Sequence, residues 1–151
     1  MITDKLNELN ITLPNAPEPV GSYVAYKKTG NLLFISGQLP ISTDGKMIKG
    51  KIGKDLTLED GQKASQLCIL NILAQANKAM NKDLDKIKNC IKITGFVNST
   101  DDFKDQPKVI NPASETLANV FGNNGKHARA AVSVNALPLG AAVEIEAIFE
   151  I

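Results

Sequence analysis

A single arginine and an alternating acidic segment near the C-terminus are the residues of this chain best suited to chemistry. Arg129 is the only arginine among the 17 basic residues. Residues 127–149 predict two β-strands joined by a Pro-Gly turn, with Arg129 at the start of the first strand and Glu144 at the start of the second. A guanidinium held on a strand can bind a carboxylate through two parallel hydrogen bonds, and a nearby glutamate can handle water or a proton. The pattern therefore predicts a site for a small carboxylic acid.

Both residues also have an ordinary structural interpretation. Arg129 could form a salt bridge at the end of its strand. Glu144 alternates with Glu146 and Glu150 opposite the apolar residues of the same strand, as acids on a solvated strand face do. Nothing in the segment itself separates Glu144 from Glu146, so the structural and the functional interpretations both stay open at this point.

Further polar candidates lie in four places. Tyr23 either packs across strands or contacts a ligand through its hydroxyl. Ser36 and Gly37 follow an apolar strand, where a glycine lets the backbone approach a ligand closely, although turns use the same pair. Asn111-Pro112 predicts a helix N-cap followed by proline at the first helical position. His127 lies two residues before Arg129, where it either lines the mouth of a cleft or belongs to an exposed loop.

The composition argues against several classes of function. Basic and acidic residues number 17 and 16, so no net field attracts nucleic acid or an anionic membrane. The absence of Trp leaves little material for base stacking, and a single histidine argues against a His-rich metal site, so neither a metal nor a cofactor is expected. Cys68 and Cys90 are predicted to be reduced, buried thiols. A charged N-terminus without an apolar run predicts a cytoplasmic protein rather than a secreted or membrane protein.

The expected order of elements is β-β-α-β-α-β-β after a short N-terminal helix. Thr57 and Asp60 suggest a capping box that opens the longest helix, and Gly122 is expected to end the second one. This order suits an α+β sheet with both main helices on one face. The strands are expected at 23–28, 32–36, 89–97 and in the two halves of 127–149. The long helix is expected to bury one apolar row, which consists of Ala64, Cys68, Ile72, Ala76 and Ala79. In the strand at 89–97, one side is expected to carry Ile91, Ile93, Gly95 and Val97.

Two helices can cover only one face of such a sheet, which leaves the other face to a partner. Residues 32–35 are apolar on both sides of their strand, and residues 130–134 nearly so. We therefore expect the uncovered face to pack against other copies of the same chain.

Three segments together resemble a known family. They are Arg-x-x-Val-x-Val-x-x-Leu-Pro from Arg129, followed by Val-Glu-Ile-Glu-Ala-Ile from Val143; Gly-Ser-Tyr-Val around Tyr23; and residues 33–40, Leu-Phe-Ile-Ser-Gly-Gln-Leu-Pro. In the order in which they occur along the chain, they resemble the RidA/YjgF family of enamine and imine deaminases, over residues 16–151, with residues 1–15 as an N-terminal extension. The resemblance implies a single-domain chorismate-mutase-like fold assembled as a homotrimer, with active sites in the clefts between subunits.

The resemblance also implies roles for individual residues. Arg129 matches the carboxylate-binding arginine of the family, and Glu144 matches the acid that orients the attacking water. Tyr23, Ser36, Gly37 and Asn111 match positions at the substrate. Two positions depart from many members: Ala131 replaces a cysteine whose main-chain carbonyl contacts the water, and Ser114 replaces a common aromatic. Extra residues around 42–56 and 105–110 place the chain in a longer branch and predict a differently shaped pocket.

The function implied by the resemblance is hydrolysis of reactive 2-enamine and 2-imine acids, such as 2-aminoacrylate, to 2-oxo acids and ammonia, as protection against damaging metabolites and without a cofactor. A non-catalytic trimer that binds a small carboxylate and regulates a metabolic enzyme is the alternative. Endoribonuclease activity, a label often attached to the family, ranks lowest because the charge, the single histidine and the scarce aromatic residues disfavour RNA binding.

Overall fold

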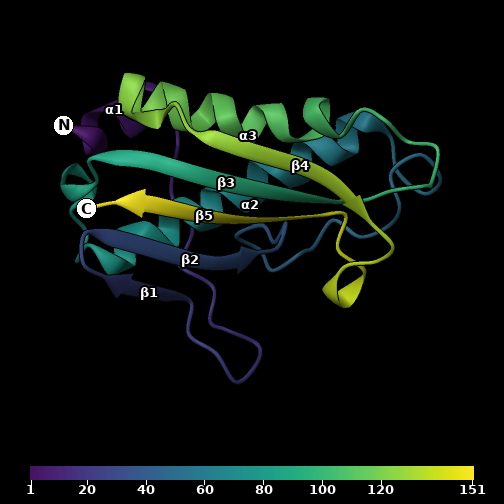
Figure 1. The fold of residues 1–151 in the computed structure, drawn as a ribbon, viewed down its shortest axis with the longest axis horizontal. Helices are drawn as coiled ribbons and strands as arrows, with labels where there is room; N and C mark the ends of the chain where they lie inside the picture. Colours follow the sequence, from purple (N-terminus) through teal and green to yellow (C-terminus); the bar gives the residue numbers. More distant parts are fainter.

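The computed structural model describes all 151 residues and shows one five-stranded mixed sheet with two long helices. The strands lie in the order β1-β2-β5-β3-β4, and only β3 and β4 run parallel (Figure 1). The expected α+β class is therefore confirmed. The element bounds are α1 (Ile2–Glu8), β1 (Tyr26–Thr29), β2 (Leu32–Gln38), α2 (Leu58–Ala79), β3 (Asn89–Asn98), α3 (Gln106–Phe121), β4 (Ala128–Val134) and β5 (Val143–Glu150).

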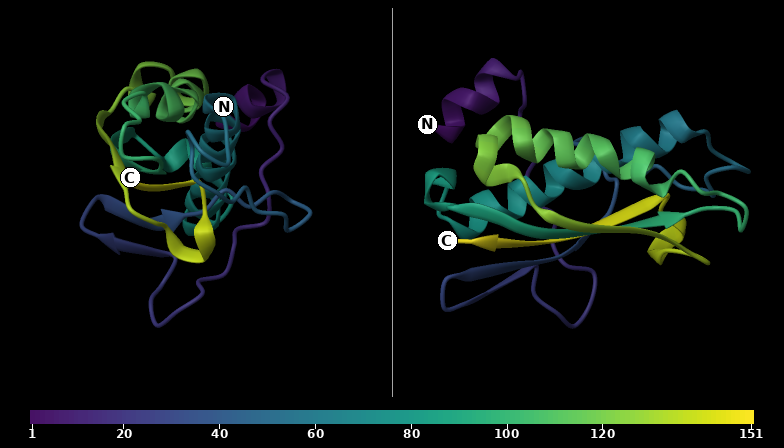
Figure 2. Two further views of the ribbon diagram at one scale, coloured as in Figure 1. Left: turned by 90° about the vertical axis from the view of Figure 1, so that its right-hand side faces the viewer. Right: turned by 45° about the horizontal axis from the view of Figure 1, so that its top comes forward.

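Helices α2 and α3 cover one face of the sheet, and no helix covers the other face (Figure 2). Strand β5 is the central strand, and its side chains alternate between the helix-covered face and the bare face of the sheet. Val143, Ile145 and Phe149 are fully buried beneath the helices, whereas Glu144 and Glu146 lie on the opposite face. None of these helices combines the length and the apolar surface that a membrane-spanning helix needs.

The long helix α2 begins where the sequence predicts it. The Thr57 side chain accepts a hydrogen bond from the Asp60 backbone, and the Asp60 carboxylate accepts one from the Thr57 backbone, which completes the capping box. All five residues of the predicted apolar row are buried.

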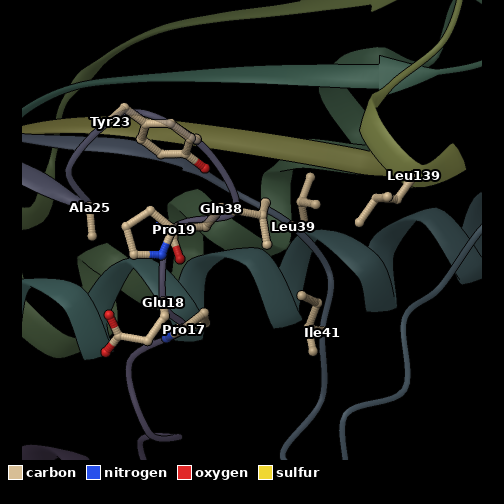
Figure 3. A pocket seen from close by; sticks show the side chains of 11 residues that line it. Pro17, Glu18, Pro19, Tyr23, Ala25, Gln38, Leu39, Ile41 and Leu139 are labelled. Atoms are coloured by element: carbon tan, nitrogen blue, oxygen red, sulfur yellow. The ribbon is translucent and has the colours of Figure 1, made fainter.

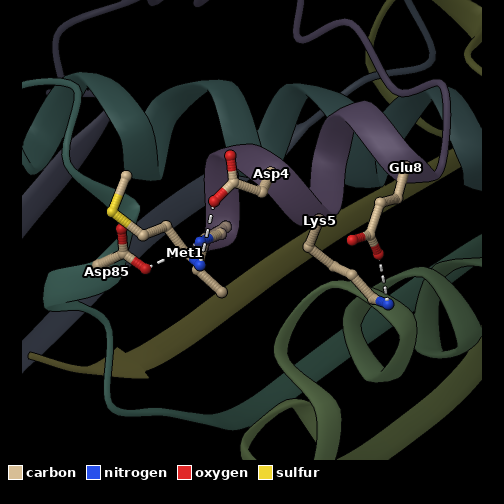
Figure 4. A network of polar contacts seen from close by, with 6 residues as sticks. Met1, Asp4, Lys5, Glu8 and Asp85 are labelled. Carbon is tan, nitrogen blue, oxygen red and sulfur yellow. Dashed lines mark hydrogen bonds and ion pairs between the residues drawn. The ribbon is translucent and has the colours of Figure 1, made fainter.

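The short helix α1 packs onto this domain through its apolar side chains, with Ile2 and Leu9 beside the buried Leu6, and through a few polar contacts. Leu6 is buried in the main core. The backbone N–H of Ile2 donates to the Asp85 carboxylate at 2.8 Å, and ion pairs between Met1 and Asp4 and between Lys5 and Glu8 lie along the exposed side (Figure 4).

The predicted start of α3 at Asn111-Pro112 is wrong, because the helix begins at Gln106, nearly two turns earlier. Proline inside a helix leaves the carbonyl four residues before it without its usual donor. Here that carbonyl belongs to Lys108, and the Gln62 side chain of α2 donates to it at 3.0 Å. A contact from the neighbouring helix thus lets α3 continue through Pro112.

Two strand predictions also need correction. Strand β1 begins at Tyr26, so Tyr23 lies in the loop before it. Ile91 does not share a side with Ile93, because a bulge between Cys90 and Lys92 reverses the alternation and leaves Ile91 40% exposed.

The C-terminal strands form as predicted but do not pair with each other. Strand β3 lies between them, so the Pro138–Gly140 segment leads across β3. Because β4 is parallel to β3 and β5 antiparallel to it, the starts of β4 and β5 lie toward opposite ends of the sheet.

The close packing of α3 on β3 at Gly95 gives a first test. A methyl group at Gly95 would overlap the Ile110 side chain, and overpacking of a core costs about 1–3 kcal/mol. We expect Gly95→Ala to lower the free energy of unfolding by that amount in urea denaturation, and Gly95→Ala/Ile110→Val to recover part of it. Equal stability of wild type and Gly95→Ala would show that this contact does not position α3.

Candidate functional site

The candidate residues form two separate groups, and the first surrounds Arg129. Arg129 is opposite Ile93 in the β3–β4 ladder, so its side chain lies on the helix-covered side of the sheet, at the edge strand. One terminal guanidinium nitrogen donates to Asn111 Oδ1 at 3.0 Å and to Ser114 Oγ at 3.2 Å. Both bonds use the same nitrogen, so the other terminal nitrogen and Nε keep their protons for a ligand.

Arg129 has no carboxylate partner within the chain. None of the ion pairs involves it, so the structural salt bridge that the sequence left open does not form. Asn111, which does not cap the helix, projects from the second turn of α3 and holds the guanidinium instead.

His127 belongs to the same group and is not a free loop residue. Its Nδ1 lies 2.6 Å from the Gly125 carbonyl and its Nε2 lies 2.9 Å from Ser114 Oγ. A carbonyl can only accept, so Nδ1 carries a proton; when Nε2 carries none, it accepts from the Ser114 hydroxyl. Ser114 in turn accepts from Arg129. The chain of bonds from Arg129 through Ser114 to His127 orients all three side chains.

These side chains line an open hollow between α3 and the start of β4. Arg129 and Lys126 contribute positive charge and Glu115 contributes one negative charge. Ala131 lies two residues beyond Arg129 on the same side of β4 and is half-buried. The hollow suits a small anion, and its lining residues are Asn111, Ser114, Glu115, Ala118, Gly125, Lys126, His127 and Arg129.

The second group surrounds Glu144 on the other face. Strand β2 has a bulge between Ile35 and Gln38, which pair with Ala147 and with Ile145, the neighbour of Glu144, in β5. The Glu144 carboxylate lies against the Cα of Gly37, where any Cβ would collide with it. Burial raises the pKa of Glu144, and the charge of Glu146 raises it further. Glu146 itself is exposed, so the structure separates two acids that the sequence could not.

Tyr23 and Ser36 complete this second group. The Ser36 hydroxyl donates to the Val24 carbonyl at 2.7 Å, and the Ser36 backbone donates to the Ala25 carbonyl at 3.0 Å. These bonds tie the loop that carries Tyr23 to β2. Tyr23 and Gly37 then line a groove beyond the end of that strand (Figure 3).

The two groups do not meet within one chain. Arg129 is level with Ile93, whereas Glu144 is level with Phe96, three residues further along β3. That offset is about 10 Å along the strands, and β4 lies about 9.5 Å from β5 across the sheet. The two side chains also lie on opposite faces. One small substrate can therefore contact both residues only if a second chain brings them together.

The remaining reactive residues are structural. Cys68 and Cys90 are free and buried, as predicted. Burial raises the pKa of Cys90 to about 12 and that of Cys68 as well, so neither is a nucleophile at neutral pH. No group of three or more His, Cys, Asp or Glu side chains is placed to hold a metal ion.

Comparisons with known proteins find matches over nearly the whole chain. The family profile described as Endoribonuclease L-PSP matches residues 13–151. Protein TCP17 of Trypanosoma cruzi is 42% identical over 151 residues, which is 99% of this chain and 94% of the relative. The crystal structure of Atu1372 from Agrobacterium tumefaciens, described as of unknown function, is 47% identical with a TM-score of 0.90, covering 99% of this chain and 93% of that one. A 2-iminobutanoate/2-iminopropanoate deaminase of Dermatophagoides farinae is 28% identical over 139 residues, which is 91% of this chain and 92% of the relative.

The raised pKa of Glu144 gives a second test. A carboxyl whose pKa is higher folded than unfolded destabilises the fold when ionised, and this penalty is fully present above the folded pKa and disappears as the pH falls toward the unfolded value. We expect Glu144→Gln to unfold at a higher temperature than wild type at pH 7, and this difference to shrink toward pH 4. The exposed Glu115→Gln serves as the control. A Glu144→Gln difference independent of pH would contradict the burial of this charge.

Proposed function

Because the chain belongs to the RidA/YjgF/L-PSP family, we propose that it hydrolyses 2-imine and 2-enamine acids to 2-oxo acids and ammonia. The observation that carries the proposal is the guanidinium of Arg129, which Asn111 and Ser114 hold through one terminal nitrogen, so that the other terminal nitrogen and Nε are left for a ligand. The name of the Dermatophagoides farinae relative, an imine deaminase, supports the same reaction class.

In the proposed reaction Arg129 binds the substrate carboxylate and Glu144 acts on water. The Glu144 carboxylate takes a proton from water while the oxygen attacks the carbon of the protonated imine, and the C=N electron pair moves to nitrogen. The resulting amine takes a proton and leaves as ammonia while the new hydroxyl loses its proton and becomes the 2-oxo group. The raised pKa of Glu144 makes it a stronger base for the first step. The main-chain carbonyl of Ala131 is proposed to hold the same water.

The separation of Arg129 and Glu144 supports a site shared between copies of the chain. The uncovered face of the sheet exposes three large apolar side chains, Phe34, Ile91 and Val132, each 39–43% exposed. Such a face favours burial against another sheet. We propose a homotrimer in which Arg129, Asn111, Ser114 and His127 of one subunit face Glu144, Tyr23, Ser36 and Gly37 of the next.

Two other functions make different demands on the same residues. A non-catalytic carboxylate sensor needs Arg129 but no base, so the burial of Glu144 against Gly37 favours hydrolysis over it. RNA cleavage needs a basic surface, and the near-zero net charge disfavours it.

The carboxylate-binding role of Arg129 is tested by a coupled assay. A pyridoxal-phosphate lyase generates 2-aminoacrylate or 2-iminobutyrate, and its decay is followed with wild type, Arg129→Ala and Arg129→Lys. Loss of a charged, bidentate contact of about 1.5–3 kcal/mol predicts a fall of kcat/KM by about 10- to 150-fold for Arg129→Ala. Arg129→Lys keeps the charge but loses the fork, and an intermediate rate is expected. Unchanged decay with Arg129→Ala would remove this residue from the mechanism.

A shared site predicts complementation between two inactive variants. Arg129→Ala and Glu144→Gln chains are co-expressed with different tags and purified through both. Every trimer that carries both tags has one site in three that combines an intact arginine with an intact glutamate, so about a third of wild-type activity is expected. Mixing Arg129→Ala with the Arg129→Ala/Glu144→Gln double variant is the control. No recovery in the first mixture would place both residues of each site in one chain.

A further inference from the structure

A groove with apolar walls opens beside Gly37, on the side of the molecule that carries Glu144. It is bounded by the loop before β1, by the segment that follows β2 and by the connection between β4 and β5 (Figure 3). Its lining residues are Pro17, Glu18, Pro19, Val20, Tyr23, Ala25, Gly37, Gln38, Leu39, Ile41 and Leu139.

The charged and amide side chains of this groove are already engaged. The Glu18 carboxylate pairs with Lys78 at 2.9 Å. The Gln38 amide donates to the Ser36 carbonyl and accepts from Gln75. No unpaired charge therefore faces the groove, and its walls favour an aliphatic group over a polar one.

Leu139 forms one wall of the groove at a conformational cost. Its φ is 59°, in the left-handed region that leucine rarely adopts. Pro138 precedes it and the Gly140 backbone donates to the Leu137 carbonyl at 3.0 Å, so residues 137–140 form a turn that usually has glycine at the third position. Leu139 is also 63% exposed, so burial in the core does not explain the leucine.

The surrounding hydrogen bonds hold this strained backbone in place. The Ala141 backbone donates to the Pro138 carbonyl at 3.1 Å, and the Gly50 backbone donates to the Gly140 carbonyl at 2.9 Å. A strained backbone conformation that neighbouring hydrogen bonds hold in place indicates a functional role for the side chain. In Figure 3 the Leu139 side chain points toward Leu39 and the Tyr23 ring.

We infer that this groove binds the aliphatic side chain of the substrate and that Leu139 determines its specificity. Only Gly37 separates the groove from the Glu144 carboxylate, so a substrate whose reacting carbon lies at Glu144 places its side chain there. The inference rests on the proposed deaminase function and narrows its substrate class. The substrates are 2-imino acids with branched aliphatic side chains, in preference to the smallest ones.

The test compares two ligands and four proteins. The dissociation constants of 4-methyl-2-oxopentanoate and pyruvate, the 2-oxo acids with a branched and a minimal side chain, are measured by calorimetry for wild type, Leu139→Ala, Leu139→Gly and Lys82→Gly. Lys82 has a φ of 66° in the loop after α2, away from the groove, and is the matched control for a glycine at positive φ. Hydrolysis of the leucine-derived and alanine-derived imines is measured in parallel.

We expect wild type to prefer the branched ligand, and both Leu139 variants to lose about tenfold of this preference. Lys82→Gly is expected to keep the full preference. Leu139→Gly is expected to melt about 2–4 °C above Leu139→Ala, because glycine relieves the backbone strain. A wild type that prefers pyruvate, or a preference unchanged in both Leu139 variants, would overturn the inference.

The two readouts separate this inference from the proposed function. Hydrolysis of both imines with no dependence on Leu139 would support the deaminase and refute the groove as a specificity site. Preferential binding of the branched ligand that depends on Leu139, with hydrolysis of neither imine, would refute the deaminase and leave the groove as the binding site of a carboxylate sensor.

Discussion

The alternation of side chains across a β-sheet is the constraint on which the rest of this structure depends. Arg129 lies on the side that α3 covers, which is why Asn111 and Ser114 can hold its guanidinium. Glu144 lies on the bare side, where only the bulge of β2 and Gly37 shield it from water. Neither residue can change sides without exposing a row of buried core residues. An active site that uses both must therefore be assembled from more than one chain.

Local patterns in the sequence were enough to predict most of the elements. The capping box at Thr57 and the glycine stop at Gly122 depend on neighbouring residues only, and both occur as expected. The start of α3 was not predictable in this way, because Pro112 is tolerated through a bond from Gln62 in another helix. The position of β3 between the two C-terminal strands likewise depends on contacts between residues far apart in the chain.

The candidate site was likewise predictable only in the features that do not depend on contacts between distant residues. Residue types and the family resemblance singled out Arg129 and Glu144, but the burial that distinguishes Glu144 from Glu146 arises from a bulge in another strand. The bonds of His127 to Ser114 and Gly125 required the structure, since the sequence favoured an exposed loop position over a cleft position. Leu139 carries no signal in the sequence except its place after a proline, where a glycine would be usual.

The bond from Gln62 to the Lys108 carbonyl has a consequence for how the two helices can move. Side chains packed ridge into groove can slide along one another by small steps, but a hydrogen bond loses most of its strength within a fraction of an ångström. The Gln62 bond to the carbonyl that Pro112 leaves free therefore sets the axial position of α3 against α2. Asn111 and Ser114 lie within one turn of Pro112 on the same helix, so the bond that sets the axial position of α3 also sets the height at which these two side chains meet the Arg129 guanidinium.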